Sequence, residues 1–497
     1  MWGWMISRVM SHPDLRRAGI CACLLVLSMV LGCFSPTRYG TPQPTQAMTP
    51  RYADLVLEGE VRERWWEAYD DPQLNILIEH ILEDNLTLQV AYLRLLDSLL
   101  AYEQTKSGYY PTIGFSAGLG GGGRIAEQSR VDPSYNLGLS LSYEVDIWGK
   151  IRAEAAISEL SSLSAQDAVE SAMLSIIGQV VTEWFNVQYY HDRIKLTQQL
   201  LEISESYNEL VQVYYRAGRA TGMDLLEQRD QIETLRSTLL AHETNARLAE
   251  QALYLLAGGQ RQINVPGSLP EHIDVGGTVD IDQLLERRPD IRAARRTAQQ
   301  ADARVVVALA DRLPTLRLSA SLSFRSNTLA DLFKTLIWDV AGNFAANLFD
   351  GGRRSKALDR AKVGYLQEQL NYGAVVLKSI SEVEGALLRH RLRAQELADA
   401  RSNLSSRQEI LESSRQYFIG GVLDYSRVLS ALRGMVSASQ AELDARRALL
   451  LAQINVYLAM GGGSWLKETS DSGTKRAYEL LESLDREQRG GNEQGED

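Results

Sequence analysis

The chain has 497 residues, of which 23% are charged, and a formal net charge of −11. This length is sufficient for one large core or two to three ordinary ones, and the negative charge argues against nucleic acid as a partner. The three cysteines lie at positions 21, 23 and 33 and the six histidines are scattered, so the sequence contains no Cys/His cluster that could build a metal site.

The N-terminus reads as a targeting signal. A segment with three arginines (residues 8–17) precedes a short apolar run (18–31), the pattern of a secretory signal peptide. The run ends in Val30-Leu31-Gly32-Cys33, which resembles the bacterial lipobox. We therefore expect residues 1–32 to be a lipoprotein signal peptide and Cys33 to carry a covalent lipid. A plain signal peptide with an incidental cysteine is the alternative.

The residues after Cys33 indicate where the lipoprotein goes. Phe34 replaces the aspartate that retains many such lipoproteins in the inner membrane, which favours sorting to the outer membrane. Residues 35–50 are rich in Pro and Thr, as expected of an extended tether. The segment 33–54 is therefore expected to be a lipidated N-terminus and tether.

Four stretches alternate apolar with small or polar residues, which is the pattern of β-strands. They are expected at about 112–123, 135–147, 315–325 and 338–349. Their length also fits strands of a transmembrane barrel. Four strands cannot close a barrel, because known single-chain barrels start at about eight strands and lipid does not tolerate open edges. The strands therefore form either an ordinary soluble sheet or part of one barrel shared by several chains.

Long proline-free runs predict unusually long helices at 150–216 and 352–419. At 1.5 Å per residue each would extend about 100 Å. Their apolar positions alternate with polar ones, which favours packing of helix against helix. A glycine-marked turn follows each run, and a shorter helix returns at about 224–257 and 427–460.

Shorter helical stretches, at about 74–107 and 282–312, precede the first strand of each half. The second is expected to break and restart at Pro289, because proline suits the first position of a helix. Glycines stop the two returning helices, as helix C-caps usually do. The charged, glycine-rich residues 464–497 are expected to form a disordered tail.

The sequence repeats itself with an offset of 203 residues. Clear matches are Pro111 with Pro314, Tyr215-x-x-Gly218 with Phe418-x-x-Gly421, and Gly258-Gly259 with Gly461-Gly462. Each copy is too long for a solenoid unit. The chain therefore reads as a duplicated half-molecule, with repeat 1 at 55–265 and repeat 2 at 266–463.

Several short motifs occur in a fixed order along these repeats. They are Trp65-Trp66 before Asp71-Pro72-Gln73-Leu74, Pro111 at the first strand, Tyr143 to Gly149 after the second, Leu348 to Arg353 after the fourth, and an aromatic-x-x-Gly turn in each hairpin. The ordered set, over about residues 55–463, resembles the outer membrane factor family of TolC-like exit ducts, and most closely its lipidated NodT/OprM-type branch.

The resemblance implies a mainly α fold with transmembrane β-strands. Three identical chains would each lend four strands to a twelve-stranded barrel in the outer membrane, continued by a long α-helical barrel in the periplasm. It implies a passive conduit for small molecules such as drugs, without catalytic residues or a cofactor other than the lipid on Cys33. It implies two partners, a periplasmic adaptor and an inner-membrane transporter of the resistance-nodulation-division class.

Two other functions remain open. The chain could be the exit duct of a type I protein secretion system, or a lipid-anchored helical scaffold in the periplasm. An enzyme has no support, because the sequence lacks a nucleophile elbow, a phosphate loop and a metal cluster.

The resemblance places the turns around Gly218 and Gly421 at the periplasmic end of the duct. Adaptor hairpins dock there in the family, which implies docking at Gly218, Thr221, Gly421 and Asp424.

The pore of the family narrows at the same end. Acidic residues three apart share a helix face, so Asp224 and Glu227 are candidates for the constriction, and Arg427 and Ser430 hold the equivalent places in repeat 2. The family often has an aspartate where this chain has Ser430, so the usual acidic ring is altered here. We expect Arg427 to reach Asp224 or Asp424 and to hold the resting duct closed.

Overall fold

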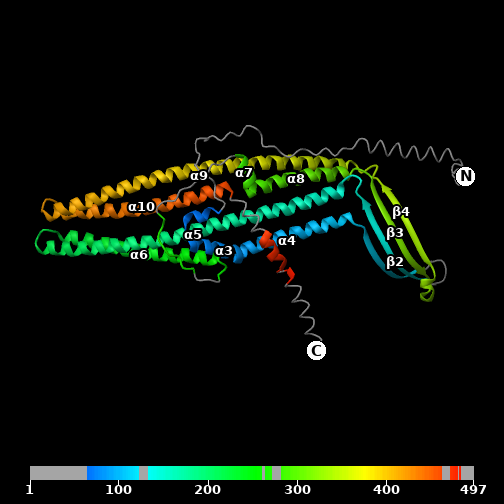
Figure 1. The fold of residues 1–497 in the computed structure, drawn as a ribbon, viewed down its shortest axis with the longest axis horizontal. Coiled ribbons are helices and arrows are strands. Elements are labelled where there is room, and N and C mark those ends of the chain that lie inside the picture. Colours follow the sequence, from blue (N-terminus) through cyan, green and yellow to red (C-terminus); the bar gives the residue numbers. More distant parts are fainter. Residues whose placement is uncertain are drawn as a thin grey trace, which may run out of the picture.

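The computed structural model describes residues 64–122, 132–259, 263–270, 281–461, 471–479 and 481–482. The expected signal peptide, the lipidated Cys33 and the tether lie outside the described residues. Long antiparallel helices form a rod, and a four-stranded sheet lies at one end of it (Figure 1). The helical hairpins end at the other.

The helix bounds follow the proline-free runs of the sequence. The helices are α3 (Pro72–Asp84), α4 (Leu86–Lys106), α5 (Lys150–Arg216), α6 (Gly222–Leu256), α7 (Ile281–Arg287), α8 (Pro289–Ala310), α9 (Arg353–Ile419) and α10 (Tyr425–Met460). Each of α5 and α9 has 67 residues. Helix α5 contacts α4 and α8 on the sheet side and α6 and α10 toward the hairpin ends, whereas α9 contacts α8 and α10 (Figure 1).

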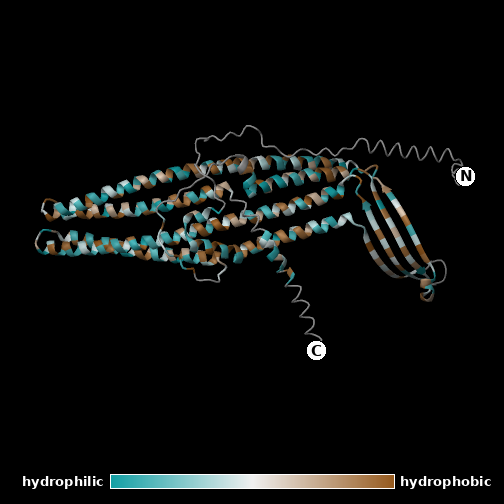
Figure 2. Ribbon diagram, viewed as in Figure 1, coloured by the Kyte–Doolittle hydropathy of each residue, from teal (hydrophilic) through white to brown (hydrophobic). Residues whose placement is uncertain are grey.

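The strands are β1 (Thr112–Gly122), β2 (Asp132–Val145), β3 (Thr315–Ser326) and β4 (Leu336–Ala345), within a few residues of the expected ranges. They pair in chain order and antiparallel. One pairing row joins Phe115, Leu139, Leu322 and Trp338, all apolar and all exposed by 47% or more. Apolar and polar side chains alternate along every strand (Figure 2). The described sheet therefore exposes an apolar face and has two unpaired edges, β1 and β4.

None of the described helices carries an apolar stretch long enough to cross a membrane.

A large core lies in the middle of the rod and fixes the start of the described chain. The Trp65 ring stacks on that of Tyr457, with centroids 5.2 Å apart. The Asp71 carboxylate accepts a hydrogen bond from the Trp184 indole N–H, at 2.9 Å, and its other oxygen accepts from the Gln73 N–H at the start of α3. One carboxylate thus caps α3 and joins it to α5.

The helical stretch before each sheet is broken at equivalent positions. The expected break at Pro289 is confirmed, with α8 starting there. The helical stretch expected at about 74–107 is present, with a break at Asn85 that was not expected. Its side chain accepts from the Leu88 N–H at 3.0 Å and donates to the Leu256 carbonyl at 2.8 Å, so it ends α3 and caps α4.

Part of the expected disordered tail is helical. Residues 471–479 form helical turns against α3 and α4, where Ala477 is buried and Arg476 donates to the Glu83 carbonyl at 3.0 Å. A side chain added at Gly473 would collide with the Tyr92 ring, 2.1 Å away. The expectation of disorder is wrong for this stretch, because its small apolar face is buried against α3 and α4. The rest of the tail lies outside the described residues, apart from 481–482.

Candidate functional site

Both long helices end in the same backbone turn. Gly218 and Gly421 adopt φ values of +70° and +76°. The N–H of the residue after each glycine donates to the carbonyl of Tyr214 or Tyr417, at 2.8 and 2.9 Å, which closes the helix end. No atom lies within 4 Å of a Cβ added at either glycine. The left-handed backbone, rather than crowding, therefore requires glycine at both tips.

The first returning helix begins with a capping box. The Thr221 hydroxyl accepts from the Asp224 N–H at 3.2 Å, and the Asp224 carboxylate accepts from the Thr221 N–H and hydroxyl at 2.7 Å each. At the equivalent place of the second tip, Asp424 starts α10 without a side-chain cap bond and is exposed. The two tips thus share a backbone conformation and differ in whether a side chain caps the helix that follows.

The constriction candidates are not joined as expected. Arg427 and Ser430 are both exposed, and in the described parts of the chain Arg427 has no ion pair within 4 Å. The expected link from Arg427 to Asp224 or Asp424 is therefore wrong within one chain. The physical reason at Asp224 is that its carboxylate is held by the start of its own helix.

A different arginine joins the two hairpins. Arg433 of α10 donates from Nε to Oε1 of Gln231 at 3.1 Å, and its Nη1 lies 3.9 Å from Oε2 of Glu227. Because Glu227 and Gln231 both lie on α6, this arginine connects the returning helices of the two repeats. Its place on an exposed helix face gave no sign of this in the sequence.

A buried hydrogen-bond chain lies beside that arginine. The Tyr425 hydroxyl donates to Oε1 of Gln228 at 2.9 Å, and Nε2 of Gln228 donates to the Ser204 carbonyl at 2.6 Å. Gln228 is 0% exposed and Tyr425 is 2% exposed. Burial raises the pKa of Tyr425, so its hydroxyl remains a donor at physiological pH. These two hydrogen bonds connect α10, α6 and α5 near the tips.

Aromatic side chains pack around these hydrogen bonds. The Phe418 ring contacts Tyr214 and Tyr425, with centroids 4.6 and 5.5 Å apart. These residues belong to an apolar cluster near the tips that also contains Val211, Val428 and Leu429. Sequence reasoning missed Gln228, although one signal was present: it interrupts the apolar row that Leu225, Ile232 and Leu235 form on α6.

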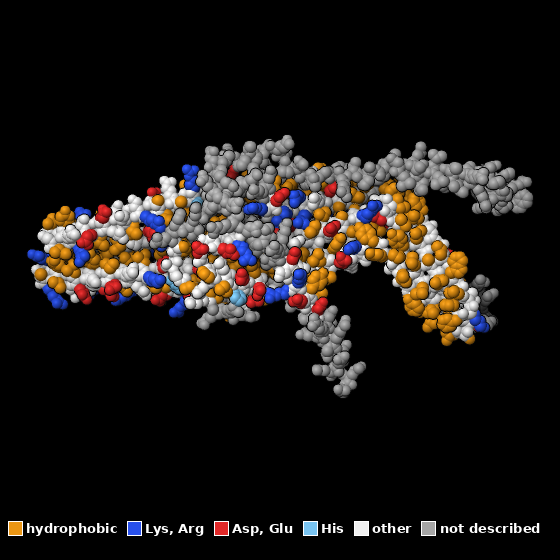
Figure 3. Space-filling view, viewed as in Figure 1, with side chains coloured by type: hydrophobic (Ala, Val, Ile, Leu, Met, Phe, Trp, Pro, Cys, Tyr) orange, Lys and Arg blue, Asp and Glu red, His pale blue; other side chains and the backbone are white. Residues whose placement is uncertain are grey.

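Apolar side chains are exposed at both ends of the molecule (Figure 3). At the tips they are Val213, Tyr215, Met223, Leu226, Tyr417, Ile419 and Val422. On the sheet they include Ile113, Phe115, Leu119, Trp338, Val340 and Phe344. Exposed apolar patches of this kind mark surfaces that meet a partner or a membrane. The long helices thus separate two exposed apolar surfaces, each suited to contact with a partner or a membrane.

Known proteins share this architecture. The family model of the outer membrane efflux proteins matches residues 77–259 and 281–462, one segment in each repeat. The chain is 25% identical over 415 residues to the probable outer membrane lipoprotein SilC of Salmonella typhimurium, covering 81% of this chain and 88% of SilC. It is 28% identical over 418 residues to the pyoverdine export outer membrane protein OpmQ of Pseudomonas aeruginosa, covering 80% and 87% of the two chains.

A solved structure extends the likeness to three dimensions. The outer-membrane channel OprN matches with a TM-score of 0.80 at 25% identity, over 86% of this chain and 98% of that one. The mainly α fold with a small sheet that the sequence predicts is confirmed by this match. The chain belongs to the outer membrane efflux protein family, and it is an efflux channel of the outer membrane.

Proposed function

We propose that this channel is the exit duct of a tripartite efflux system and works as a homotrimer. The observation that carries the proposal is the four-stranded sheet, which exposes an apolar face, has two unpaired edges and continues into the long helices. Three chains would supply twelve strands, enough for a closed barrel with its apolar face toward lipid. The helices would continue the barrel as a periplasmic tunnel.

The tips are the proposed docking surface for a periplasmic adaptor. Gly218 and Gly421 set two turns of the same shape, and Thr221 and Asp424 begin the helices that follow. The exposed apolar side chains at these turns supply contact area. An inner-membrane transporter of the resistance-nodulation-division class would load the adaptor and duct with cargo.

The constriction is proposed at the same level, between Asp224 and Glu227 of α6 and Arg427 and Ser430 of α10. Arg427 and Ser430 are exposed in the single chain, so their side chains are available to other copies. Since Asp224 and Glu227 already have partners within the chain, the gate would be held by helix packing as well as by charge.

Cys33 is the proposed lipid attachment site. The lipobox-like sequence supports it, and one relative, SilC, is described as a lipoprotein. Small molecules are the proposed cargo. The relative OpmQ is described as a pyoverdine export protein, which supports an export role for this chain.

The test is site-specific photocrosslinking of the full chain in cells. A photoreactive residue replaces Val422, 71% exposed at the second tip, and in a matched control it replaces Leu329, 65% exposed beside the sheet. We expect the first variant alone to capture a periplasmic adaptor, identified by mass spectrometry, together with a resistance-nodulation-division transporter. Capture of an ABC transporter would point to polypeptide secretion. No adaptor at Val422 would contradict the proposal.

A further inference from the structure

The apolar face of the sheet ends at different heights on the two middle strands. On β2 it runs from Val145 to Tyr135, whereas on β3 it runs from Leu316, the partner of Val145, to Phe324. The partner of Tyr135 is Ser326, a polar residue. The apolar face of β3 therefore stops one row before that of β2.

This difference in height matters in a bilayer. At 3.3 Å per residue, the apolar face measures about 33 Å along β2 and about 26 Å along β3. The strands of a membrane barrel tilt by about 40°, which reduces these heights to about 25 Å and about 20 Å. Because the apolar band of such a barrel is about 25 Å tall, β2 spans it alone and β3 leaves about 5 Å to other residues.

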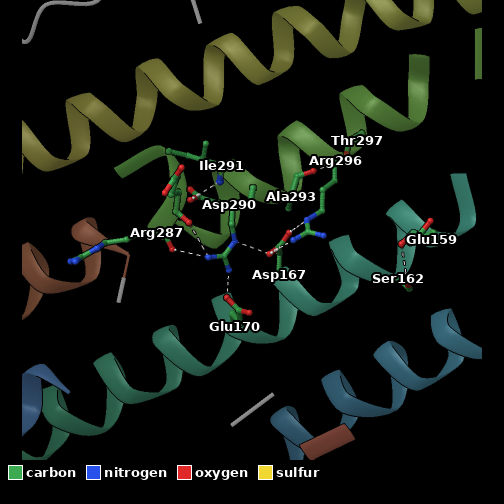
Figure 4. A network of polar contacts seen from close by, with 12 residues as sticks. Glu159, Ser162, Asp167, Glu170, Arg287, Asp290, Ile291, Ala293, Arg296 and Thr297 are labelled. Carbon is green, nitrogen blue, oxygen red and sulfur yellow. Dashed lines mark hydrogen bonds and ion pairs between the residues drawn. The ribbon is translucent and has the colours of Figure 1, made fainter. Parts of the chain in front are cut away.

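Charged side chains mark where the apolar face ends toward the helices. In the helical rod, Asp167 of α5 pairs with Arg292 and Arg296 of α8, at 2.9 and 2.5 Å (Figure 4). Where the helices join the strands, Lys150 pairs with Asp311 at 2.8 Å. None of the side chains on the apolar face of the four described strands is charged. The height that β3 lacks can therefore be added only at its other end.

A short 3-10 helix, η3 (Leu329–Lys334), lies at that end and joins β3 to β4. With three residues per turn, side chains three positions apart lie one above the other. Together with the residue before it, η3 has one polar column and two apolar ones: Thr328, Asp331 and Lys334; Leu329 and Leu332; Ala330 and Phe333. The Asp331 carboxylate accepts from the Thr328 hydroxyl at 2.8 Å and pairs with Lys334 at 2.5 Å. The polar column thus neutralises its own charge.

Helix η3 folds back over the apolar face of the sheet. The Phe333 ring contacts the Phe324 ring edge to face, with centroids 5.4 Å apart, and Leu332 is buried. Phe333 itself remains 68% exposed and Leu329 65% exposed. The apolar surface therefore continues from the sheet onto η3, at the place where the apolar face of β3 ends.

We propose that η3 is a membrane anchor in the outer leaflet of the outer membrane, with its apolar columns among the acyl chains and its polar column toward the headgroups. Leu329 and Phe333 supply the height that the apolar face of β3 lacks. Amphipathic helices lie in the plane of a membrane interface in this way. The inference rests on the proposed barrel, which turns the apolar face toward lipid, and adds a lipid-binding surface outside the strands.

The position of η3 favours lipid over a second copy of the chain. The strands that are free to pair with another copy are the edge strands, β1 and β4. Pairing at an edge extends the sheet sideways, whereas η3 contacts the two middle strands, β2 and β3. The pairing of Asp331 with Lys334 also leaves η3 without a net charge that would attract a charged protein.

The test is site-directed spin labelling of the full chain in phospholipid vesicles. The matched variants are Phe333→Cys, in an apolar column, and Lys334→Cys, at the next residue in the polar column. Both native side chains are exposed, by 68% and 74%. Leu322→Cys reports on the apolar face of the sheet itself. The unsubstituted chain gives the background of the natural cysteines, which all lie at position 33 or before.

Oxygen dissolves among acyl chains and a nickel chelate stays in water, so collisions with each reagent identify the surroundings of a label. We expect the label at Phe333→Cys to meet oxygen as often as the label at Leu322→Cys. It should meet the chelate several-fold less often than the label at Lys334→Cys.

The outcomes separate the anchor from the barrel on which it rests. If the chelate reaches Phe333→Cys as readily as Lys334→Cys while Leu322→Cys is protected, the anchor is wrong and the barrel stands. A label at Phe333→Cys that is shielded from both reagents would mean that protein covers η3, which also overturns the anchor. If the chelate reaches Leu322→Cys, the barrel fails and the anchor fails with it.

The role of η3 in height is tested with bilayers of two thicknesses. Leu329→Ser with Phe333→Ser should insert like wild type into thin dilauroyl phosphatidylcholine vesicles. In thicker dioleoyl vesicles, the fraction that floats with the lipid should fall several-fold, because the apolar band is then too short. Leu329→Met with Phe333→Leu keeps the apolar surface and should match wild type in both. An equal result for the serine variant in the two lipids would contradict this role.

Discussion

Asn85 and Arg288 occupy equivalent positions in the two repeats, and each binds the end of its own returning helix. The Asn85 amide donates to the Leu256 carbonyl at 2.8 Å, and the Arg288 guanidinium donates to the Ala459 carbonyl at 3.0 Å. The acceptors are again 203 residues apart. Two side chains of different chemistry thus satisfy equivalent carbonyls at the helix ends, so the contact recurs in both repeats although the residue differs.

Asn85→Ala should destabilise repeat 1. The substitution removes the cap of α4 and leaves the Leu256 carbonyl without its donor, a loss of about 1–3 kcal/mol. A lower midpoint of thermal unfolding, followed by circular dichroism in detergent at a fixed scan rate, would report it. Thr87→Ala, on the exposed side of the same helix, should leave the midpoint within about 1 °C. Equal midpoints for the two variants would contradict the role of Asn85.

Gly461→Ala should be more damaging than its location at a helix end suggests. Gly461 has φ +87°, and an added Cβ would lie 2.8 Å from the Arg288 Cα. The left-handed backbone alone costs about 1–2 kcal/mol for alanine, and the collision adds to it. Gly420→Ala is the matched control, since its φ is −70° and its nearest neighbour would be 3.5 Å away. Thermal unfolding should separate the two; similar losses would argue against the close approach.

Tyr425→Phe should loosen the hairpin tips. It leaves the buried Gln228 oxygen without a donor, at a loss of about 1–2 kcal/mol, and weakens the link between α10 and α6. Single-channel recording in planar bilayers should show the open fraction rise several-fold. Tyr417→Phe removes the hydroxyl of a tyrosine that is 56% exposed at the same tip and should behave like wild type. An unchanged open fraction for Tyr425→Phe would exclude this bond from the gate.

His242 should make the protein less stable in mild acid. Burial lowers the pKa of His242 and Arg193 lowers it further, while Asp444 acts in the opposite direction. Nε2 of His242 accepts a hydrogen bond from Nε of Arg193 at 3.2 Å, which requires a neutral ring. The folded state therefore binds fewer protons than the unfolded one. The stability that neutral His242 contributes is fully present above the ordinary histidine pKa of about 6.5, and it is lost as the pH falls toward the lowered pKa of the folded state.

The measurement is the unfolding midpoint at pH 7.5 and pH 5.5. Wild type should lose more than His242→Gln over this interval, because glutamine does not titrate. Ser237→Ala, on the exposed side of the same helix, should keep the wild-type difference. If His242→Gln also keeps it, another group governs the acid sensitivity.

Local signals in the sequence predicted most of the fold. The absence of proline and the repeat offset located α5 and α9 to within a residue, and Pro289 located the start of α8. Alternating side chains located the strands. The break at Asn85 was missed because asparagine is common in many settings, and only its bond to Leu256, 171 residues away, shows that it caps a helix.

The candidate site was less accessible to sequence reasoning. The turn glycines and the Thr221–Asp224 capping box are local sequence patterns, so they can be predicted without knowledge of the tertiary structure. The bond between Tyr425 and Gln228 spans 197 residues and depends on how the two hairpins pack. Arg427 was named because it holds the place equivalent to Asp224, and Arg433 was not considered. Both are charged residues on α10, and only the three-dimensional packing brings Arg433 to α6.

The matched lengths of α5 and α9 limit how such a duct can evolve a different reach. An insertion of seven residues in α5 alone would extend one hairpin by about 10 Å and leave the other behind. The returning helices α6 and α10 would need the same insertion to keep each hairpin closed. A longer or shorter duct therefore requires four coordinated changes in one chain. Because the two repeats must match, the length of the duct in the periplasm can change only when both repeats change together.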